Sequence, residues 1–252
     1  MERPERIKRA SYEWSTMRRR QLRRIWVIIT LFAAYFGVQL FSNSAWATEQ
    51  RILFGINEVA MPTDMKNLKM LSSWVRMLDR HTRDENRRDA PCVPATSQAA
   101  CAISEWLNFI DREKSDDKTH QLQKINVHLN LHRYILDIVN YGIVDYWATP
   151  REFAINDGDC EDFAIAKYIT LRKLGWSPMD LRIVVLNDLN LRIGHAILVV
   201  YVDEKAYVLD NQIKQIVEAG VIRHFRPVYS VNEERSWIYA APFRINDILK
   251  TN

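Results

Sequence analysis

The chain has 252 residues, of which 48% are hydrophobic and 26% charged, enough for one well-buried domain without collagen-like, coiled-coil or low-complexity bias. Its net charge of +4 comes from residues 1–24, which carry nine Lys/Arg and three Asp/Glu, whereas the rest carries 26 basic and 28 acidic side chains. No basic surface is expected beyond residue 24, so we predict no nucleic-acid binding.

The N-terminal segment is typical of an export signal. A basic stretch at 18–24 leads into the apolar segment Ile25–Phe41, and Ala45-Trp46-Ala47 supplies a small-residue cleavage pattern. The alternative is an uncleaved membrane anchor, because 17 apolar residues nearly span a bilayer. We therefore predict a signal peptide at 1–47 and an exported domain at 48–252, located in the periplasm in either case.

The first half of the domain shows the apolar spacing of helices. An extended entry segment at 48–65 precedes it, and the stretches 82–97 and 143–158 are expected to be irregular connections. Gly142 stands where a C′ glycine would end the third helix. The predicted helices are Lys66–His81, Ala99–Asp111, Lys118–Tyr141 and Asp159–Leu174.

The second half is rich in short runs of Val, Ile, Leu and Tyr, which predict strands. Asp203-Glu204-Lys205 is expected to turn between two of them, as in a hairpin. Helices followed by a meandering sheet indicate an α+β fold, and we find no linker that would divide residues 48–252. The predicted strands are Leu181–Leu186, His195–Val202, Ala206–Asp210, Pro227–Val231 and Trp237–Ala240.

Three cysteines fit an exported protein. Cys92 and Cys101 are nine positions apart and can close a short disulfide loop in an oxidising compartment, although two unpaired thiols are the alternative. Cys160 is then an odd thiol, which raises the question of a function.

A nucleophile, a base and an orienting acid can be assembled around Cys160. It lies at a predicted helix N-terminus, where free N–H groups favour a thiolate and can bind an oxyanion. His195 opens a strand, and Asp210 ends the next strand of the predicted hairpin, so the two are expected to be neighbours. The sequence therefore predicts a Cys160–His195–Asp210 triad.

Acidic residues crowd the predicted nucleophile. Asp157, Asp159, Glu161 and Asp162 lie within three positions of Cys160, and nearby carboxylates oppose a thiolate. Such acids can cap a helix, or their oxygens can hold Ca²⁺. Spacing alone fits both explanations equally well.

These residues carry a family resemblance. Asp145–Pro150 and Gly158–Tyr168 resemble the bacterial transglutaminase-like cysteine proteases, and more narrowly the LapG-type periplasmic proteases that release biofilm adhesins. Gly194-His195-Ala196 and Val208–Asn211 match that family's His and Asp motifs. The resemblance covers roughly residues 50–245.

The resemblance implies a papain-like, transglutaminase-type fold and calcium-dependent cleavage of a large repeat adhesin near its N-terminal retention module. It implies Ca²⁺ ligands at Asp159 and Glu161, and Asp162 matches the motif as well. It also implies an inner-membrane receptor for cyclic-di-GMP whose periplasmic domain sequesters the protease and so controls biofilm attachment. An acyl transferase and a non-catalytic binding module on the same fold are the alternatives.

Overall fold

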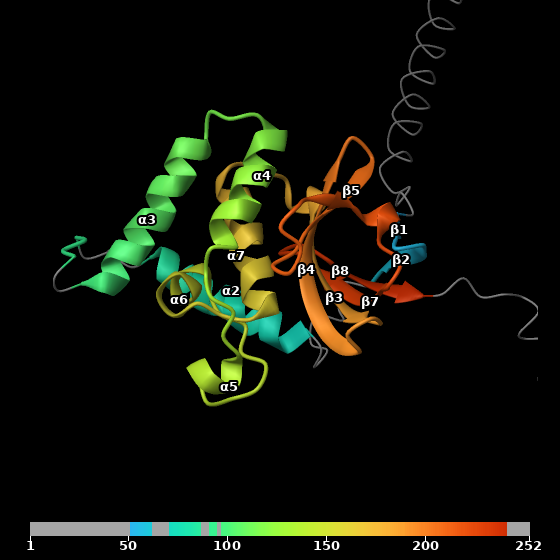
Figure 1. The fold of residues 1–252 in the computed structure, drawn as a ribbon, viewed down its shortest axis with the longest axis horizontal. Coiled ribbons are helices and arrows are strands. Elements are labelled where there is room, and N and C mark those ends of the chain that lie inside the picture. Colours follow the sequence, from blue (N-terminus) through green and yellow to red (C-terminus); the bar gives the residue numbers. More distant parts are fainter. Residues whose placement is uncertain (1–50, 62–70, 87–90, 95–96, 241–252) are drawn as a thin grey trace, which may run out of the picture. The chain divides into compact units, whose positions relative to one another are not determined.

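The computed structural model describes residues 51–61, 71–86, 91–94 and 97–240. In this part of the chain the helices lie on one side of a single antiparallel sheet (Figure 1). The α+β prediction, with helices packed on an antiparallel sheet, is therefore confirmed. The predicted signal peptide at 1–47 lies outside the described residues. No helix in the described ranges is long and apolar enough to cross a membrane.

Three of the four predicted helices are confirmed in type and approximate position. The first runs four residues past its predicted end at His81, and its predicted start at Lys66 lies outside the described residues. The α-helices are α2 (Ser72–Glu85), α3 (Gln98–Glu113), α4 (Lys118–Leu129), α5 (Asp137–Asn140), α6 (Pro150–Asn156) and α7 (Cys160–Lys173), with short 3₁₀ helices at Pro178–Asp180 and Ala219–Val221.

The long helix predicted at Lys118–Tyr141 is wrong beyond Leu129, where α4 ends. The chain then turns toward the segment before α7, and the Ile135 N–H donates to the Gly158 carbonyl at 2.8 Å. These contacts with distant residues outweigh the local helix propensity. Gly142 has a φ of +70° and lies in a turn after the short helix α5.

The connection predicted at 143–158 contains the helix α6, which the sequence analysis missed. Pro150 occupies its first position, and Thr149 is its N-cap. The Thr149 hydroxyl accepts the Glu152 N–H at 3.2 Å, while the Glu152 carboxylate accepts the Thr149 N–H at 2.8 Å. This reciprocal capping box starts a seven-residue helix, and its Thr-Pro-x-Glu signature is visible in the sequence.

The five predicted strands are all present, in a sheet with the order β1-β2-β8-β7-β3-β4-β5-β6 and antiparallel pairing throughout. The short strands β1, β2 and β6 were not predicted. The strands are β1 (Ile52–Leu53), β2 (Ile56–Ala60), β3 (Leu181–Asp188), β4 (Ile193–Val202), β5 (Lys205–Leu209), β6 (Val217–Glu218), β7 (Phe225–Val231) and β8 (Ser236–Ala240).

The hairpin of β4 and β5 is formed by a tight turn. Asp203 and Glu204 both have positive φ, at 47° and 64°, as a two-residue hairpin turn requires. The pairing of β5 with β4 starts at Leu198, so the first residues of β4 extend beyond this partner. The first residues of β4 therefore have no paired strand on the side where β5 ends.

Hydrophobic residues cover both faces of the sheet. Ile183, Leu198 and Leu209 belong to the core on the helical side, whereas Val184 and Val199 belong to a second core on the other face. Helix α7 packs on β3 and β4, and its residues from Glu161 to Leu171 are all buried. Helix α7 also packs against α4. The first residue of this central helix is thereby held in a fixed position against β4.

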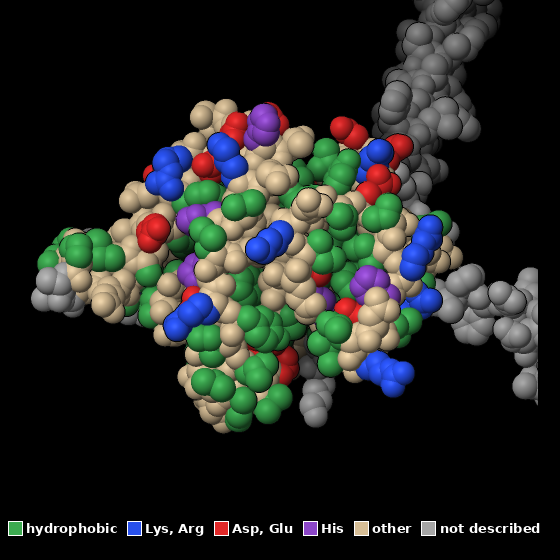
Figure 2. Space-filling model, in the orientation of Figure 1, with side chains coloured by type: hydrophobic (Ala, Val, Ile, Leu, Met, Phe, Trp, Pro, Cys, Tyr) green, Lys and Arg blue, Asp and Glu red, His purple; other side chains and the backbone are tan. Residues whose placement is uncertain are grey.

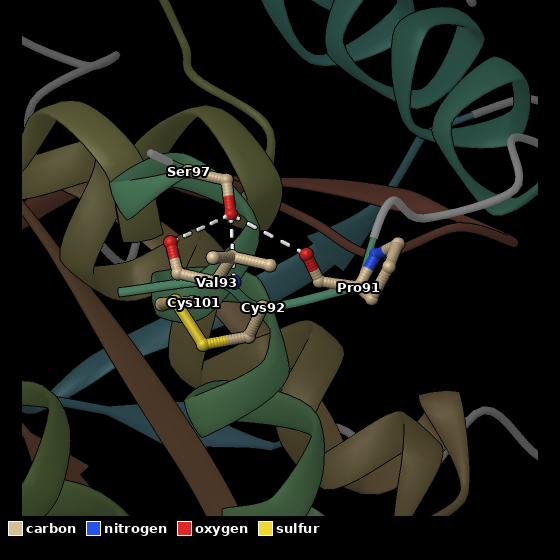
Figure 3. Close-up of a disulfide and its surroundings, with 5 residues drawn as sticks. All are labelled: Pro91, Cys92, Val93, Ser97 and Cys101. Atoms are coloured by element: carbon tan, nitrogen blue, oxygen red, sulfur yellow. Dashed lines mark hydrogen bonds between the residues drawn. A yellow bond between two sulfur atoms is a disulfide. The ribbon is translucent and has the colours of Figure 1, made fainter. Parts of the chain in front are cut away.

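The predicted disulfide is present, and joins Cys92 to Cys101 near the start of α3 (Figure 3). The Ser97 hydroxyl accepts the Val93 N–H at 2.8 Å inside the closed loop. Cys160 is the free cysteine, as the pairing requires.

Candidate active site and carboxylate cluster

Cys160 is the first residue of α7, and the backbone before it is tightly constrained. Asp162, one turn into the helix, accepts the backbone N–H of the N-cap residue Asp159 at 3.2 Å. A Cβ atom on Gly158 would lie 2.2 Å from the Asp162 carboxylate, so only glycine fits at this position. Glycine at position 158 is therefore a steric requirement of this helix start.

The residue that leads into this turn has an unusual backbone. Asp157 has a φ of 60° and a ψ of −163°, a combination that is costly for any residue other than glycine. Its carboxylate is held by His132 at 2.9 Å and by the Arg133 guanidinium at 2.7 Å. These contacts fix the Asp157 turn, and they explain why the chain after α4 folds back instead of continuing as a helix.

His195 and Asp210 form a buried pair, as predicted. The His195 Nε2–H donates to Asp210 Oδ1 at 2.9 Å, and both residues are almost completely buried. The Gln212 N–H donates to the same oxygen at 2.9 Å. From α4, the Asn130 side chain donates to the Asp210 backbone carbonyl at 2.8 Å. The loop after β5 is thus anchored so that Asp210 fixes the orientation of the imidazole.

Cys160 lies against the strand that carries His195. The backbone N–H of Ala196, the residue after His195, faces the thiol and lowers its pKa. This contact occurs where the start of β4 extends beyond its pairing with β5. The structure therefore brings the thiol to the His195 end of β4.

The electrostatic surroundings of Cys160 oppose a thiolate. Burial raises the pKa of the Cys160 thiol well above its ordinary value, and the carboxylates of Glu161 and Asp159 raise it further. The Cys160 thiol donates to Glu161 Oε2 at 3.0 Å. A positive charge near the carboxylates would therefore favour a thiolate at this position.

Four carboxyl groups form a cluster at the start of α7: Asp159 and Glu161 flank the thiol, and Asp137 and Asp162 lie next to Asp159. Three of the four were predicted as metal ligands: Asp159, Glu161 and Asp162. Oxygens of Asp137, Asp159 and Asp162 lie within 4.8 Å of one another, as do one oxygen each of Asp159 and Glu161 and the Cys160 sulfur. All four acids are buried. Burial raises the pKa of Asp159 to about 8 and that of Asp137 to about 6. Such a set of crowded oxygens fits a hard divalent cation.

Unpaired oxygens support this fit. Asp159 Oδ1 and Asp137 Oδ1 are buried and have no hydrogen-bond partner among the described residues. Asp162 differs, because its two oxygens accept the Ala148 N–H at 2.6 Å and the Asp159 N–H at 3.2 Å. A carboxylate oxygen has room for a backbone donor and a metal ion, so Asp162 stays a candidate ligand.

Asp137 was missed in the sequence analysis. It begins α5, and its second oxygen accepts the Tyr146 N–H at 2.5 Å. The sequence places it 22 positions before Asp159, inside a stretch that was predicted to continue a helix. The sequence did offer one signal. Asp137 is a lone acid in the apolar run Ile135-Leu136-Asp137-Ile138-Val139.

Comparison with known protein families decides the assignment. The model of the family described as bacterial transglutaminase-like cysteine proteinase BTLCP matches residues 92–238. The chain belongs to this family. The matched stretch contains Cys160, His195 and Asp210, together with the whole carboxylate cluster. The protein is thus a transglutaminase-like cysteine protease.

Solved structures of one bacterial protein are similar to the chain. Legionella pneumophila LapG is 29% identical, with a TM-score of 0.53, and the match covers 69% of this chain and 92% of that one. An EGTA-treated form is 30% identical over 66% and 86% of the two chains, with a TM-score of 0.53. A calcium-bound form is 29% identical over 69% and 96%, with a TM-score of 0.52. Comparison with curated proteins found no match.

Proposed function

We propose that this transglutaminase-like protease is a calcium-dependent endopeptidase of the periplasm, which cuts a large repeat adhesin near its N-terminus and thereby controls biofilm attachment. The observation that carries the proposal is the buried His195–Asp210 pair, beside a cysteine at the start of α7. The calcium-bound LapG structure supports the metal, and the sequence resemblance to LapG-type proteases supports the substrate class. Export depends on the predicted signal at 1–47.

The proposed chemistry uses three side chains. His195 takes the proton of Cys160, and the sulfur attacks the scissile carbonyl carbon, so that a C–S bond forms and the carbonyl oxygen becomes an oxyanion. Free N–H groups at the start of α7 stabilise this oxyanion. His195 then gives its proton to the leaving amine as the C–N bond breaks. Because Nε2 is bonded to Asp210, Nδ1 is the nitrogen left for this proton transfer.

Hydrolysis of the thioester completes the cycle. A water molecule gives one proton to His195 and attacks the acyl carbon, after which the C–S bond breaks and Cys160 is released as a thiol. The same thioester could be attacked by an amine, in which case the protein would be an acyl transferase. Incubation with a labelled amine and a cleavable substrate separates the two reactions, because only a transferase incorporates the label.

The carboxylates that would hold calcium are Asp159 and Glu161, with Asp137 and Asp162 completing the set. Bound calcium would supply the positive charge that offsets these acids beside the thiol. In the metal-free protein the same acids favour the protonated thiol. We therefore propose that calcium sets the protonation state of Cys160.

An exposed apolar segment borders the proposed site and suits a polypeptide substrate. The segment 131–144 presents several large hydrophobic side chains, which gather around α5 in Figure 2. Tyr134 in this segment pairs with Gly158 and lies close enough to Cys160 for the two to interact electrostatically. Contiguous exposed apolar surface is typical of protein-binding sites. Its exposed members are Leu131, Tyr134, Leu136, Ile138, Val139, Ile143 and Val144.

We further propose that an inner-membrane receptor for cyclic-di-GMP sequesters the protease through its periplasmic domain. The resemblance to LapG-type proteases supports this partner. A binding assay with the isolated periplasmic domain of such a receptor tests it, and the absence of inhibition would remove the partner from the proposal.

The main experiment compares released and surface-bound adhesins by mass spectrometry in cells with the wild-type protein and with Cys160→Ala. The variant should retain the adhesin on the surface, and chelation of calcium should do the same for the wild type. Unchanged adhesin release by Cys160→Ala would exclude the proposed function. If adhesin release by the wild type resists chelation, the proposed calcium dependence is excluded but the protease function is not. Lack of labelling of Cys160 by a thiol-reactive probe would favour a non-catalytic binding module.

A further inference from the structure

Lys167 of α7 is a buried cation to which the proposed reaction assigns no role. Its side chain is 0% exposed, and within the described part of the chain its Nζ has no hydrogen-bond partner. Nζ lies 5.9 Å from the centroid of the Phe163 ring. Burying an ammonium group without a direct partner is costly, so stability does not explain a lysine here.

Asp210 offers the matching unpaired charge. Its Oδ1 accepts hydrogen bonds from His195 and Gln212, whereas its Oδ2 is buried and has no partner among the described residues. Burial lowers the pKa of Lys167 to about 7, and attraction to Asp210 is the opposing effect. The ammonium and the carboxylate therefore interact without a direct ion pair.

Helix α7 connects the two ends of the proposed triad. Cys160 is its first residue, and Lys167 follows two turns later. One helix thus places the nucleophile at one end of the triad and a positive charge near the carboxylate at the other. With Lys167 protonated, the thiolate, imidazolium, carboxylate and ammonium sum to zero charge.

We propose that Lys167 is a positioning residue, whose buried ammonium attracts the Asp210 carboxylate and thereby keeps it in place to accept the Nε2–H of His195. This inference rests on the proposed roles of Cys160, His195 and Asp210. Without the ammonium, the buried Oδ2 of Asp210 has no opposite charge to attract it, so the carboxylate is held less firmly and orients the imidazole less well. The effect of Lys167 on Cys160 is therefore transmitted through Asp210.

The test measures how fast iodoacetamide alkylates Cys160, which requires no knowledge of the adhesin. Cys92 and Cys101 are paired, so Cys160 is the reactive thiol. Lys167→Met removes the charge and keeps a similar volume. Lys173→Met is the matched control, because Lys173 lies on the same helix but pairs with Glu85 at 2.7 Å.

At pH 6.5 with saturating calcium, Lys167→Met should slow alkylation by about tenfold, the effect of one pKa unit, whereas Lys173→Met should stay within about twofold. At pH 8.5 the difference should shrink, because the lysine has then lost its own proton in the wild type. The titratable neighbours of the triad are the same in both variants: Asp137, Asp159 and Glu161 beside Cys160, with Tyr134 facing them.

A double-mutant cycle separates the proposed role from a structural one. In an Asp210→Asn background, Lys167→Met should change alkylation by less than about twofold, because the carboxylate through which it acts is gone. An equal slowing in both backgrounds, or at both pH values, would overturn the proposal. So would faster alkylation in Lys167→Met.

Thermal unfolding provides an independent readout. Lys167→Met should melt at the same temperature as the wild type or higher, because a buried unpaired charge is removed. Lys167→Gln serves as a second variant, and unfolding of both would contradict the inference. If His195→Ala leaves alkylation unchanged, the proposed triad itself fails, a result distinguishable from a failure of Lys167 alone.

Discussion

At the start of α7, four carboxyl groups cluster beside one thiol, whereas at the end of β5 one carboxylate is bonded to an imidazole and interacts electrostatically with a buried ammonium. Both regions are buried and lie at the same end of the sheet. The acids of the first region have raised pKa values and unpaired oxygens, as expected for a charge imbalance. The second region carries its own cation, Lys167.

The comparison shows which region contains its own positive charge and which region needs a bound cation. Like charges in a buried cluster are tolerated only when they take up protons or bind a cation. We therefore propose that the carboxylate cluster makes the thiol dependent on calcium, while the His195–Asp210 pair forms without a ligand. We infer that calcium acts on the nucleophile and leaves its base in place.

The largest expected effect comes from changing the carboxylate cluster. Asp159→Asn should lower kcat/KM by about 100- to 1,000-fold, because each pKa unit of lost thiolate stabilisation costs about tenfold in reactive species. The measurement is cleavage of an adhesin fragment across a calcium titration. Asp203→Asn is a matched control in the exposed β4–β5 turn and should have no effect. If Asp159→Asn retains calcium-dependent cleavage, Asp159 is not a calcium ligand.

A smaller loss is expected at the other region. Asp210→Asn should lower kcat by about 10- to 100-fold, because the imidazole loses its orienting acceptor while cysteine stays intrinsically nucleophilic. Calcium affinity, measured by calorimetry, should stay unchanged. A weaker calcium affinity in Asp210→Asn would show that the two regions are not independent.

Stability without calcium should fall as pH rises. The pKa values of Asp159 and Asp137 are raised to about 8 and about 6, so the folded protein binds more protons than the unfolded chain between about pH 4 and 8. The melting temperature in EGTA should therefore drop by about 5 °C or more across this window. Saturating calcium should flatten the curve. A rising curve in EGTA would contradict the raised pKa values.

The smallest effect on activity is expected far from both regions. Replacing Cys92 and Cys101 by serine should leave cleavage unchanged and cost at most about 2.5 kcal/mol of stability, from the lost constraint on a short loop. Chemical denaturation and the same cleavage assay measure both quantities. An altered calcium response in this variant would show that the disulfide supports the carboxylate cluster.

The sequence by itself determined the elements whose signals are local. Short runs of Val, Ile, Leu and Tyr located the five main strands, and the stretch from Asp159 to Leu174 located the central helix. The prediction that His195 and Asp210 are neighbours followed from hairpin geometry alone. Their hydrogen bond is present in the structure. The motif around Cys160 also led to the family, which the family match confirms.

Only the tertiary structure decided the features that depend on distant partners. The helix predicted through Tyr141 ends early, because the chain after α4 is bound to Asp157 and Gly158. The same fold-back brings Asp137 to the carboxylate cluster, and α7 brings Lys167 near Asp210. Burial sets the protonation of such groups, and burial is a property of the packed chain. Local sequence patterns report secondary structure, but not which charges become neighbours in the interior.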